Sequence, residues 1–589
     1  MSDLLRNWLR FAQGVLFFDP DGTRTIAVQL EEHAARIPDT VFLRFEQQVF
    51  TYRQANALIN RHAHAYRSAG VKAGHTIALV MDNRPSFIWH VFGLHKIGAV
   101  PSLVNTNLTG NTLAHALRAC EPFAIVASGA HSTAVREVAA EVSAQLAGGS
   151  DAMWVDHEDD PPAASSERTF NALLTGASEA NPDRTLRPQL HGLAAYIYTS
   201  GTTGLPKAAL VPHHRTYRAG AVWSAVAMRY VPGDVTYCCL PLYHSNALLL
   251  ALGSVVTGGV TLALARKFSR TRFWDDARAH GATHMIYIGE LCRYLMNAEP
   301  SPGDRRHKIR IATGNGLRPD IWQAFQDRFG LERIVEFYAA TEGNCVTLNG
   351  FGVVGSVGPQ TPNMRLVRWD EARQEIVRDA AGKPVLARTG EPGILLGKIT
   401  RKMSFEGYRD AKATEQKVLR DLFEPGDAYF NTGDLLRRDR FRLLYFTDRL
   451  GDTFRWKGEN VSTTEVQEAL SSVPGLAEVN AYGVRVPNTE GRAGMVALVM
   501  AEGASFDPVA FKAHVDRSLP GYARPLFVRV SPQLDTTATF KLKKNELQDQ
   551  GFDPGRVPDP LYLRHPQRDA YVPLDPALYA ELASGSLKL

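Results

Sequence analysis

The stretch YIYTSGTTGLPK, residues 196–207, decides the fold. It begins as an apolar strand and continues into six consecutive Thr, Ser and Gly residues before Lys207 adds a positive charge. The glycines let the backbone curl so that its N–H groups can point at one centre, and the hydroxyls add further donors. The pattern therefore predicts a polyphosphate site after a buried strand. The residues concerned are Thr199, Ser200, Gly201, Thr202, Thr203, Gly204 and Lys207.

This loop is not a Walker A motif. Gly201 and Gly204 lie three residues apart, and Lys207 is followed by Ala208 rather than by Ser or Thr. The spacing G-x-x-x-x-G-K-[ST] is thus not met, which excludes a P-loop kinase or GTPase. The alternative interpretation is a glycine-rich surface loop that binds nothing.

Short apolar runs alternate with helix-like stretches on both sides of the loop, up to about residue 350. Strands separated by helices predict buried, mostly parallel sheets, as in α/β proteins. The expected strands are residues 76–81, 124–127, 194–198, 235–239, 284–288, 309–313 and 334–338, and the expected helices include 86–96, 113–118 and 318–328. Residues 148–188 are rich in acidic residues, Pro, Ser and Ala, and are predicted to form a surface excursion.

After residue 350 the pattern changes to a β-rich lobe and then to a compact α+β segment. Alternating patterns predict strands within residues 352–367, 393–396 and 443–446, then helices at 464–473 and 508–519 with strands at 477–486 and 493–500. We predict an α/β protein with a large, multi-lobed domain over residues 1–449 and a small α+β domain over residues 450–589.

Composition and charge restrict the class of protein. Hydrophobic residues make up 44% and charged residues 22%, which indicates a globular chain. The net charge is 66 − 61 = +5 over 589 residues, which permits an anionic partner without requiring nucleic acid. Five cysteines without paired zinc spacing fit a reducing compartment, and the N-terminus lacks a signal-peptide pattern. We expect a cytoplasmic protein that does not bind nucleic acid.

Two apolar segments raise the question of membrane contact. The N-terminal residues predict a short amphipathic helix, either docked on the protein body or lying on the inner face of a membrane as a peripheral contact. Its apolar residues are Leu4, Leu5, Trp8, Leu9 and Phe11. Residues 247–265 approach the length of a membrane span, but Gly253, Gly258 and Gly259 interrupt them. A helix, a glycine turn and a buried strand at 260–265 are favoured over a transmembrane span.

A second motif, FYAATEGN at residues 337–344, follows an expected strand. Open α/β sheets bind ligands at the carboxyl ends of their strands. Tyr338 offers a flat face for a base, and Glu342 offers a hard oxygen ligand for Mg²⁺. The stretch ATGNGL, residues 312–317, follows the preceding strand, and its glycines permit close approach to a ring.

Two further motifs are weaker by themselves. In YFNTGD, residues 429–434, Asp434 can accept from two ribose hydroxyls, and Arg449 in YFTDR, residues 445–449, can reach the same sugar or a phosphate. A Thr-Gly-Asp turn is more often structural. The lysine cluster in TTATFKLKK, residues 536–544, is typical of a solvated face.

Together the four motifs resemble the adenylate-forming superfamily of acyl-CoA synthetases, luciferases and nonribosomal adenylation domains, in order and spacing along about residues 25 to 550. Finer features resemble one branch, the fatty acid transport proteins and very-long-chain acyl-CoA synthetases. These are FSxxxFW at 268–274, YIGELCRYL at 287–295, GNGLRPD at 314–320, FRWKGENVST at 454–463 and GRAG at 491–494.

The resemblance implies a fatty acyl-CoA synthetase that uses ATP, Mg²⁺ and CoA through an acyl-adenylate, and that supports fatty acid uptake by trapping its product. It implies that the loop from Thr199 to Lys207 cradles the β- and γ-phosphates and that Thr341 contacts the α-phosphate. The remaining implied roles are adenine contact for Gly314, Asn315, Gly316 and Tyr338, Mg²⁺ binding for Glu342, ribose contact for Asp434 and Arg449, an acyl-carboxylate neighbour for His244, and catalysis for Lys541.

The resemblance also implies that the small domain rotates between the two half-reactions. Lys541 serves the first half-reaction, and the segment with Arg455, Lys457 and Gly458 serves the second. The superfamily's usual hinge position carries Gly451 here, and glycine suits a backbone that must change its dihedral angles. The glycine usual before the catalytic lysine is replaced by Phe540.

Two alternatives stay open at this point. One is an acyl-AMP ligase that loads another acceptor, such as a carrier protein. The other is a non-catalytic lipid-uptake protein, against which the intact Lys207, Glu342 and Lys541 argue. Neither acyl chain length nor oligomeric state can be deduced from the sequence.

Overall fold

The structure is a computed structural model of residues 1–589. It describes all residues except 1, 144–145, 147, 150–151, 158–167, 201–204, 371–372, 451–453, 457–458, 488, 490–491, 536–543 and 588. Side chains are also not described at positions 139, 140, 143, 200, 455, 459, 460 and 545.

The chain divides into two compact units, which are described one at a time. Unit 1 comprises residues 1–316, 324–352 and 400–418, and unit 2 comprises residues 317–323, 353–399 and 419–589. The α/β class expected from the sequence is confirmed, with mostly parallel sheets in unit 1 and a β-rich lobe and an α+β region in unit 2. The domain boundary between residues 449 and 450 stays a prediction.

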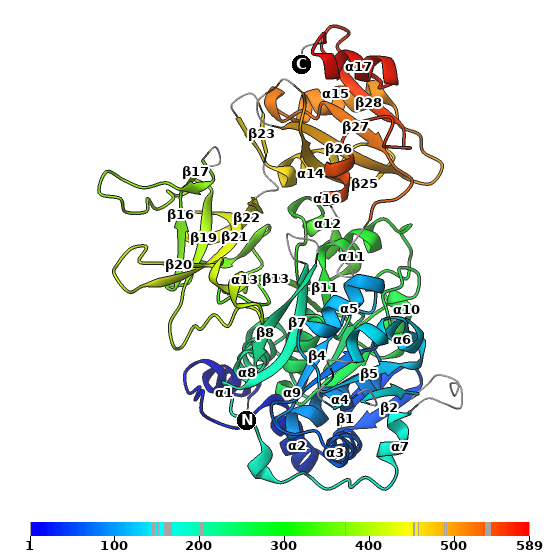
Figure 1. The fold of residues 1–589 in the computed structure, drawn as a ribbon, viewed down its shortest axis with the longest axis vertical. Coiled ribbons are helices and arrows are strands. Elements are labelled where there is room, and N and C mark those ends of the chain that lie inside the picture. Colours follow the sequence, from blue (N-terminus) through cyan, green and yellow to red (C-terminus); the bar gives the residue numbers. More distant parts are fainter. Residues whose placement is uncertain are drawn as a thin grey trace. The chain divides into compact units, whose positions relative to one another are not determined.

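Among the described residues, unit 1 contains an eight-stranded sheet with parallel pairing at its centre (Figure 1). Its strand order is β14 (Val346–Leu348), β13 (Arg333–Ala339), β12 (Ile311–Asn315), β11 (His284–Ile288), β9 (Val235–Cys238), β10 (Thr261–Leu264), β1 (Val41–Phe45) and β2 (Gln48–Thr51). Only the outer pairs, β13 with β14 and β1 with β2, are antiparallel. The carboxyl ends of the parallel strands therefore share one edge of the sheet.

A six-stranded sheet forms the second layer of unit 1. Its described strands run in the order β6 (Met153–Asp156), β5 (Ala124–Ser128), β3 (Thr76–Val80), β4 (Val100–Leu103), β7 (Leu193–Ser200) and β8 (Pro206–Pro212). The expected surface excursion at 148–188 is wrong for β6, because Trp154, Val155 and Asp156 are buried beside β5. The apolar run MWV fits a buried edge strand within an otherwise polar segment.

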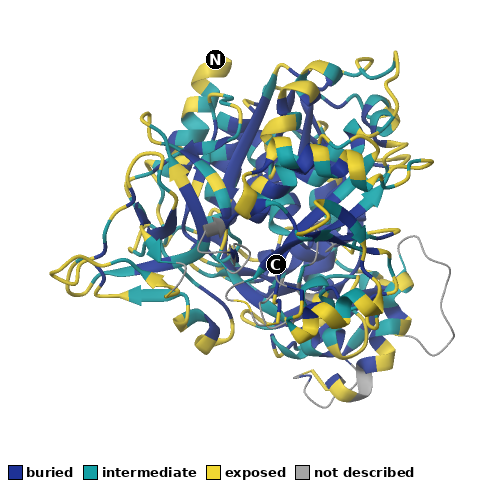
Figure 2. Cartoon of the chain, turned by 90° about the horizontal axis from the view of Figure 1, so that it is seen from above, coloured by how far each residue is buried: buried dark blue, intermediate teal, exposed yellow. Residues whose placement is uncertain are grey.

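Helices cover the sheets of unit 1. They are α1 (Asp3–Val15), α2 (Ile26–Arg36), α3 (Tyr52–Ser68), α4 (Pro85–Lys96), α5 (Gly110–Arg118), α6 (Gly129–Ser143), α7 (Phe170–Leu174), α8 (His213–Val222), α9 (Gly253–Gly258), α10 (Phe273–Ala279), α11 (Gly289–Met296) and α13 (Ala411–Glu415), with the short helices η1 (Arg184–Leu186), η2 (Trp223–Ala227) and η3 (Asn246–Leu252). Every residue of α4 is buried. Figure 2 shows in dark blue that many strand residues are buried too.

The apolar run 247–265 forms a helix, a glycine turn and a buried strand, as expected. The π-helix η3 leads into α9, and Gly259 ends α9 in the left-handed conformation with φ +65°. Strand β10 follows and pairs with β9 and β1. Across the described residues, no helix combines the length and apolar character needed to cross a membrane.

Among its described residues, unit 2 contains two larger sheets and two two-stranded sheets, β17 (Trp369–Asp370) with β18 (Glu375–Ile376) and β23 (Phe454–Trp456) with β24 (Glu459–Val461). The first is antiparallel, with β15 (Ser356–Pro359), β22 (Leu443–Arg449), β21 (Ala428–Arg438), β19 (Gly393–Lys398) and β16 (Met364–Val367) in order and β20 (Val418–Arg420) beside β21. The second has β25 (Leu476–Val484), β26 (Ala493–Met500), β27 (Phe527–Val530), β28 (Leu561–His565) and β29 (Ala570–Pro573). The helical elements are α12 (Pro319–Phe329, which extends into unit 1), α14 (Thr463–Leu470), α15 (Pro508–Ser518), η4 (Gly521–Ala523), α16 (Asn545–Gln550) and α17 (Pro576–Ser584).

The C-terminal α+β region has a hydrophobic core of its own. Buried side chains from Phe454 to Leu587 form one cluster.

Strand β26 coincides with the expected strand 493–500, and α15 ends one residue before the expected helix 508–519. Strand β12 differs more, because it spans Ile311–Asn315 rather than 309–313. Gly314 pairs with both β11 and β13, so the strand continues past residue 313, where the prediction ended it.

Candidate active site

The predicted phosphate loop closes a hairpin between β7 and β8. Thr199 pairs with Lys207 and Ser200 pairs with Pro206 in the antiparallel register. Gly201, Thr202, Thr203 and Gly204 lie outside the described residues, as does the side chain of Ser200. The strand β8 follows the loop, so the next described element provides no helix N-terminus for a phosphate. The charge comes instead from Lys207, which the register holds opposite Thr199.

Thr341 and Glu342 follow the carboxyl end of β13. The Glu342 carboxylate accepts a hydrogen bond from the Tyr408 hydroxyl at 2.7 Å through Oε1. The Arg215 guanidinium donates to the Thr341 carbonyl and, at 3.4 Å, to the Glu342 carbonyl. The backbone and the carboxylate of this turn are therefore held from two directions.

Arg215 itself is held by a buried ion pair. It lies on α8, and its Nη2 is 2.5 Å from Glu406 Oε2, with both side chains mostly buried. Ser404 also donates to Glu406 through its hydroxyl. Burial lowers the pKa of Arg215 from its ordinary value, and the carboxylates of Glu406 and Glu342 oppose that shift. Because a guanidinium titrates far above neutrality, Arg215 stays charged and keeps its donors.

Tyr408 joins this turn to the hairpin of β7 and β8. The segment around it pairs with β8: Leu210 N–H donates to the Gly407 carbonyl at 3.0 Å, and Arg409 N–H donates to the Ala208 carbonyl at 2.9 Å. Lys207 Nζ lies 5.9 Å from the centre of the Tyr408 ring. Burial, and then the Glu342 carboxylate, raise the pKa of Tyr408 far above its ordinary value, so its hydroxyl remains a donor.

We call Arg215, Thr341, Glu342, Glu406 and Tyr408 the Glu342 cluster. Three of these residues, Arg215, Glu406 and Tyr408, were not singled out from the sequence. They stand in the polar stretches HHRTYR, residues 213–218, and FEGYRD, residues 405–410. The only available signal was a density of charged and aromatic residues. The contacts of the cluster form between segments that are distant in the sequence: Arg215 and Glu342 are 127 positions apart.

The residues expected to contact adenine lie at or just after the carboxyl ends of two neighbouring parallel strands, β12 and β13. Gly314 ends the pairing of β12 with β13, opposite Glu336, and Tyr338 lies two positions later on β13. A Cβ on Gly314 would lie 2.3 Å from the Tyr287 carbonyl oxygen, so only glycine fits there. Gly316 has φ +82°, a conformation that also favours glycine. Tyr338 is buried.

His244 belongs to a segment that reaches the same strand ends. Its backbone N–H donates to the Pro241 carbonyl at 3.0 Å, and its ring packs against Tyr243 with centroids 4.7 Å apart. The next two residues link the strand ends: Ser245 Oγ lies 3.1 Å from Thr341 Oγ1, and Asn246 donates to Asn315 Oδ1 at 2.7 Å. The structure thus brings the predicted residues His244, Asn315 and Thr341 into one neighbourhood.

Asp434 and Arg449 lie directly opposite each other on β21 and β22 of unit 2. Arg449 Nε is 3.4 Å from Asp434 Oδ1, with 55% of the arginine side chain and 12% of the aspartate side chain exposed. Thr432 holds the turn before Asp434: its hydroxyl accepts from the Asp434 N–H at 3.1 Å and donates to the Leu395 carbonyl at 2.8 Å. The two motifs adjoin in the structure, and their contact with ribose stays a prediction.

Several of the predicted site residues lie outside the residues that the structure describes. Gly451, Lys457, Gly458 and Lys541 are among them, and for Arg455 only the backbone is described, in β23. In the part of the chain that is described, no group of three or more His, Cys, Asp or Glu side chains is arranged to bind a metal ion.

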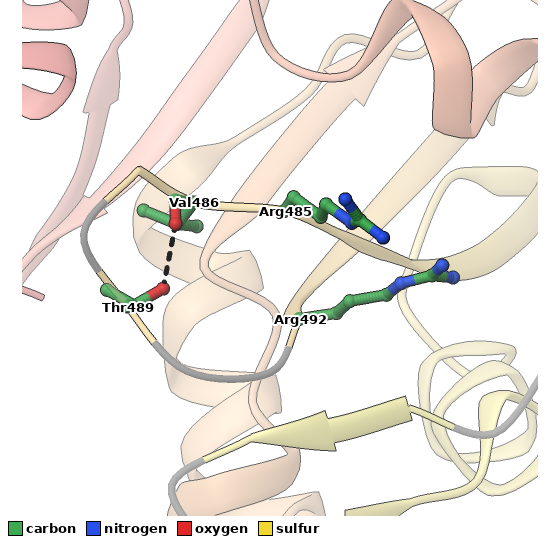
Figure 3. A pocket seen from close by; sticks show the side chains of 4 residues that line it. All are labelled: Arg485, Val486, Thr489 and Arg492. Atoms are coloured by element: carbon green, nitrogen blue, oxygen red, sulfur yellow. Dashed lines mark hydrogen bonds between the residues drawn. The ribbon is translucent and has the colours of Figure 1, made fainter. Parts of the chain in front are cut away.

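A separate cavity of about 450 Å³ lies in the C-terminal region, lined by Arg485, Val486, Thr489 and Arg492. Figure 3 shows the two arginine side chains extending in the same direction, away from the contact in which the Thr489 hydroxyl donates to the Val486 carbonyl. None of the predicted site residues lines this cavity, so it does not enter the assignment.

The fold and these motifs define an adenylate-forming enzyme. The chain belongs to the AMP-binding enzyme family, which it matches over residues 30–408, and the AMP-binding enzyme C-terminal domain matches residues 465–541.

Relatives in the fatty acid branch match nearly the whole chain. It is 41% identical to the medium/long-chain-fatty-acid–CoA ligase FadD6 of Mycobacterium tuberculosis, over 96% of this chain and 92% of the relative. It is 40% identical to long-chain fatty acid transport protein 1 of Homo sapiens, over 92% of this chain and 84% of the relative.

Solved structures show the same fold at low identity. The anthranilate CoA ligase AuaEII in complex with anthranoyl-AMP aligns with a TM-score of 0.77 at 17% identity, covering 91% of this chain and 98% of that chain. ATP-bound MatB from Rhodopseudomonas palustris aligns with a TM-score of 0.72 at 22% identity, covering 92% of this chain and 98% of that chain.

Proposed function

We propose that the protein is an ATP-dependent fatty acid–CoA ligase of the AMP-forming type, acting on medium- to long-chain or longer fatty acids. The observation that carries this proposal is the Tyr408 junction in unit 1. The Tyr408 hydroxyl donates to Glu342 Oε1 at 2.7 Å, and Lys207 Nζ lies 5.9 Å from the centre of the Tyr408 ring. A carboxylate suited to a metal and a cation suited to phosphate are thereby held beside one another, as nucleotidyl transfer requires. The similarity to fatty acid–CoA ligases and transport proteins supports the acyl substrate.

In the first half-reaction a fatty carboxylate oxygen attacks the α-phosphorus of ATP. The bond between the α-phosphorus and the bridging oxygen breaks, and pyrophosphate leaves with that electron pair. We assign Thr199, Ser200, Gly201, Thr202, Thr203, Gly204 and Lys207 to the β- and γ-phosphates and Thr341 to the α-phosphate. Lys541 neutralises charge at the α-phosphate, and His244 borders the acyl carboxylate.

Glu342 is the proposed ligand for Mg²⁺. Magnesium in nucleotide sites is held by one or two carboxylates together with substrate phosphates and water, so a single described carboxylate is enough. Tyr408 occupies Oε1 of Glu342 as a donor, which fixes the direction of the carboxylate. When bound, Mg²⁺ would supply neutralisation of phosphate charge.

The nucleoside is proposed to lie at the strand ends already described. Gly314, Asn315, Gly316 and Tyr338 form the adenine site, since the glycines permit close approach and Tyr338 supplies a ring face. Asp434 accepts from the ribose hydroxyls, and Arg449, which is half exposed beside it, reaches the same sugar.

In the second half-reaction the CoA thiol attacks the acyl carbonyl. A carbon–sulfur bond forms, the carbon–oxygen bond to AMP breaks, the thiol gives up its proton, and AMP leaves. We assign Arg455, Lys457 and Gly458 to this step, Gly451 to the hinge, and residues 1–449 and 450–589 to the two domains that the hinge joins. An uptake role would follow if the thioester traps fatty acid inside the cell, with the enzyme cytoplasmic and at the inner membrane face.

The test is AMP release measured with saturated fatty acids of increasing length, each with and without CoA. We expect CoA-dependent release with medium or longer acids and formation of the matching acyl-CoA. Acyl-AMP that accumulates without thioester in the presence of CoA would favour the alternative of a ligase for another acceptor. No fatty-acid-dependent turnover of ATP would contradict the proposal and favour a non-catalytic uptake protein.

A further inference from the structure

A buried asparagine joins the strand ends of the two sheets of unit 1. Asn83 follows β3 of the six-stranded sheet and is 2% exposed. Its Nδ2 donates to the Leu240 carbonyl and to the Ala265 carbonyl, each at 2.9 Å. Leu240 and Ala265 come after β9 and β10 of the eight-stranded sheet. One side chain therefore ties together backbone segments that lie 157 and 182 positions away in the sequence.

The third hydrogen bond of Asn83 fixes the direction of its amide. Oδ1 accepts from the Leu242 N–H at 2.8 Å, so the oxygen faces a donor and the nitrogen faces two acceptors. The two ends of the amide cannot exchange places, because its nitrogen only donates and its oxygen only accepts. Leu240 and Leu242 are themselves buried. Their backbone groups thus find partners in Asn83 away from water, where an unpaired polar group is costly.

The segment that Asn83 holds leads directly to His244. Leu240 and Leu242 flank Pro241, whose carbonyl accepts from the His244 N–H at 3.0 Å. Asn83 therefore pins the loop of residues 240–244 at its start, and this turn closes the loop at its end. The position of the His244 ring depends on the backbone that Asn83 fixes.

The residue before Asn83 supports the neighbour of His244. The Tyr243 ring is buried and packs against the His244 ring with centroids 4.7 Å apart. Burial raises the pKa of Tyr243, and a hydrogen bond with the Thr106 side chain opposes that shift. Thr106 in turn donates to Asp82 Oδ1 at 2.8 Å. Asp82 and Asn83 thus hold the loop in two ways, through the ring beside His244 and through the backbone before it.

The far end of the same segment is held separately. Ser245 Oγ lies 3.1 Å from Thr341 Oγ1, and Asn246 donates to Asn315 Oδ1 at 2.7 Å. These contacts connect the segment to the strand ends assigned to the nucleotide. Loss of the Asn83 amide would therefore loosen the His244 side of the segment while the nucleotide side keeps its own contacts.

We propose that Asn83 is a positioning residue for the fatty carboxylate, and that it acts by fixing the loop of residues 240–244 that leads to His244. The inference rests on the proposed ligase function, since that function gives His244 its place beside the carboxylate. Its consequence is selective: removal of the Asn83 amide weakens the use of fatty acid and spares the use of ATP. A side chain that only stabilised the fold would affect both substrates alike.

The test is fatty-acid-dependent pyrophosphate exchange by the full chain, with KM measured separately for the fatty acid and for ATP. In Asn83→Ala we expect KM for the fatty acid to rise about tenfold, as for the loss of one buried hydrogen bond, while KM for ATP stays within about twofold of wild type. In a His244→Ala background the same substitution should no longer raise KM for the fatty acid, because the side chain that it positions is gone.

A milder variant keeps the test decisive if Asn83→Ala does not fold. Asn83→Ser retains a hydroxyl that donates one hydrogen bond and accepts another. Its rise in KM for the fatty acid should be smaller than about tenfold and equally selective.

The matched control is Asn60→Ala, which removes another buried amide of unit 1. Asn60 lies on α3, is 1% exposed, and donates to the Glu179 carbonyl at 2.7 Å. Its loss should lower the melting temperature without a selective rise in KM for the fatty acid.

Three results would overturn the inference while leaving the ligase function in place. They are equal rises of both KM values in Asn83→Ala, a selective rise of the same size in Asn60→Ala, and an undiminished effect of Asn83→Ala in the His244→Ala background. A wild-type enzyme without fatty-acid-dependent exchange would instead overturn the proposed function, and this inference with it.

Discussion

The Glu342 cluster in unit 1 and the Asp434–Arg449 pair in unit 2 are built in opposite ways. The first is assembled from α8, the turn after β13 and the segment around Tyr408, and its ion pair between Arg215 and Glu406 is mostly buried. The second consists of facing positions on adjacent strands, with Arg449 more than half exposed. A site assembled from distant segments depends on every member, whereas a site on a hairpin is positioned by backbone pairing and tolerates the loss of its side chains.

The largest expected effect lies outside both regions, at Lys541. Lys541→Ala should lower fatty-acid-dependent pyrophosphate exchange by about 10²–10³-fold, as for the loss of one preorganised electrostatic group. Thioester formation from supplied acyl-AMP should stay within about tenfold of wild type, because the small domain is expected to rotate Lys541 away from the site before that step. Equal losses in the two assays would remove Lys541 from the adenylation step.

The comparison is tested most strongly by removing the arginine from each region. Arg215→Met should lower the free energy of unfolding by about 3–5 kcal/mol, since it leaves the Glu406 carboxylate buried without its partner. Arg449→Met should cost about 1 kcal/mol or less, because an exposed pair contributes little. Urea unfolding of both variants measures the difference. The control Arg215→Met/Glu406→Gln should recover part of the loss, and comparable destabilisation by the two single variants would contradict the comparison.

Glu342→Gln tests whether the carboxylate binds the metal. The amide keeps the size of the side chain and can still accept from Tyr408, but it loses the charge that attracts Mg²⁺. We expect the Mg²⁺ concentration for half-maximal pyrophosphate exchange to rise by about tenfold, with thermal melting unchanged. A magnesium titration that overlays wild type would exclude Glu342 as the metal ligand.

Tyr408→Phe should have the smallest effect of the series. It removes one hydrogen bond to Glu342 and keeps the ring near Lys207. The loss of one such hydrogen bond corresponds to about two- to tenfold in rate. The magnesium titration should shift in the same direction as in Glu342→Gln but by less, which a purely structural role for Tyr408 would not produce. A shift larger than that of Glu342→Gln would rule out a positioning role.

The same comparison explains what the sequence could predict. Asp434 and Arg449 were found because each ends a short motif that the family resemblance singles out, while their pairing on adjacent strands is seen only in the structure. Lys207, Glu342 and Gly314 were found because each comes shortly after a strand that the sequence predicts, although the structure places Lys207 within β8 and Gly314 within β12. Arg215, Glu406 and Tyr408 were missed, because the contacts of Arg215 and Tyr408 with Glu342, and of Glu406 with Arg215, exist only after segments distant in the sequence pack together. No local periodicity encodes such contacts.

The N-terminal helix α1 shows a second limit of the same kind. The amphipathic pattern of α1 was visible in the sequence, with docking on the body and membrane contact left as alternatives. The structure shows that docking through Arg10 and Gly14 leaves Leu4, Leu5 and Trp8 exposed, whereas Ala12 is buried. The structure thus shows α1 docked on unit 1, and contact with a membrane stays a prediction.

The measurement that tests the central claim most directly is fatty-acid-dependent exchange of labelled pyrophosphate into ATP by the wild-type enzyme without CoA. The exchange requires reversible attack of the carboxylate on the α-phosphate and nothing else. We predict exchange that needs a fatty acid and Mg²⁺ and that is independent of CoA, with acyl-CoA formed once CoA is added. Acyl-CoA formation with no exchange in the absence of CoA would contradict an acyl-adenylate made in a separate first step.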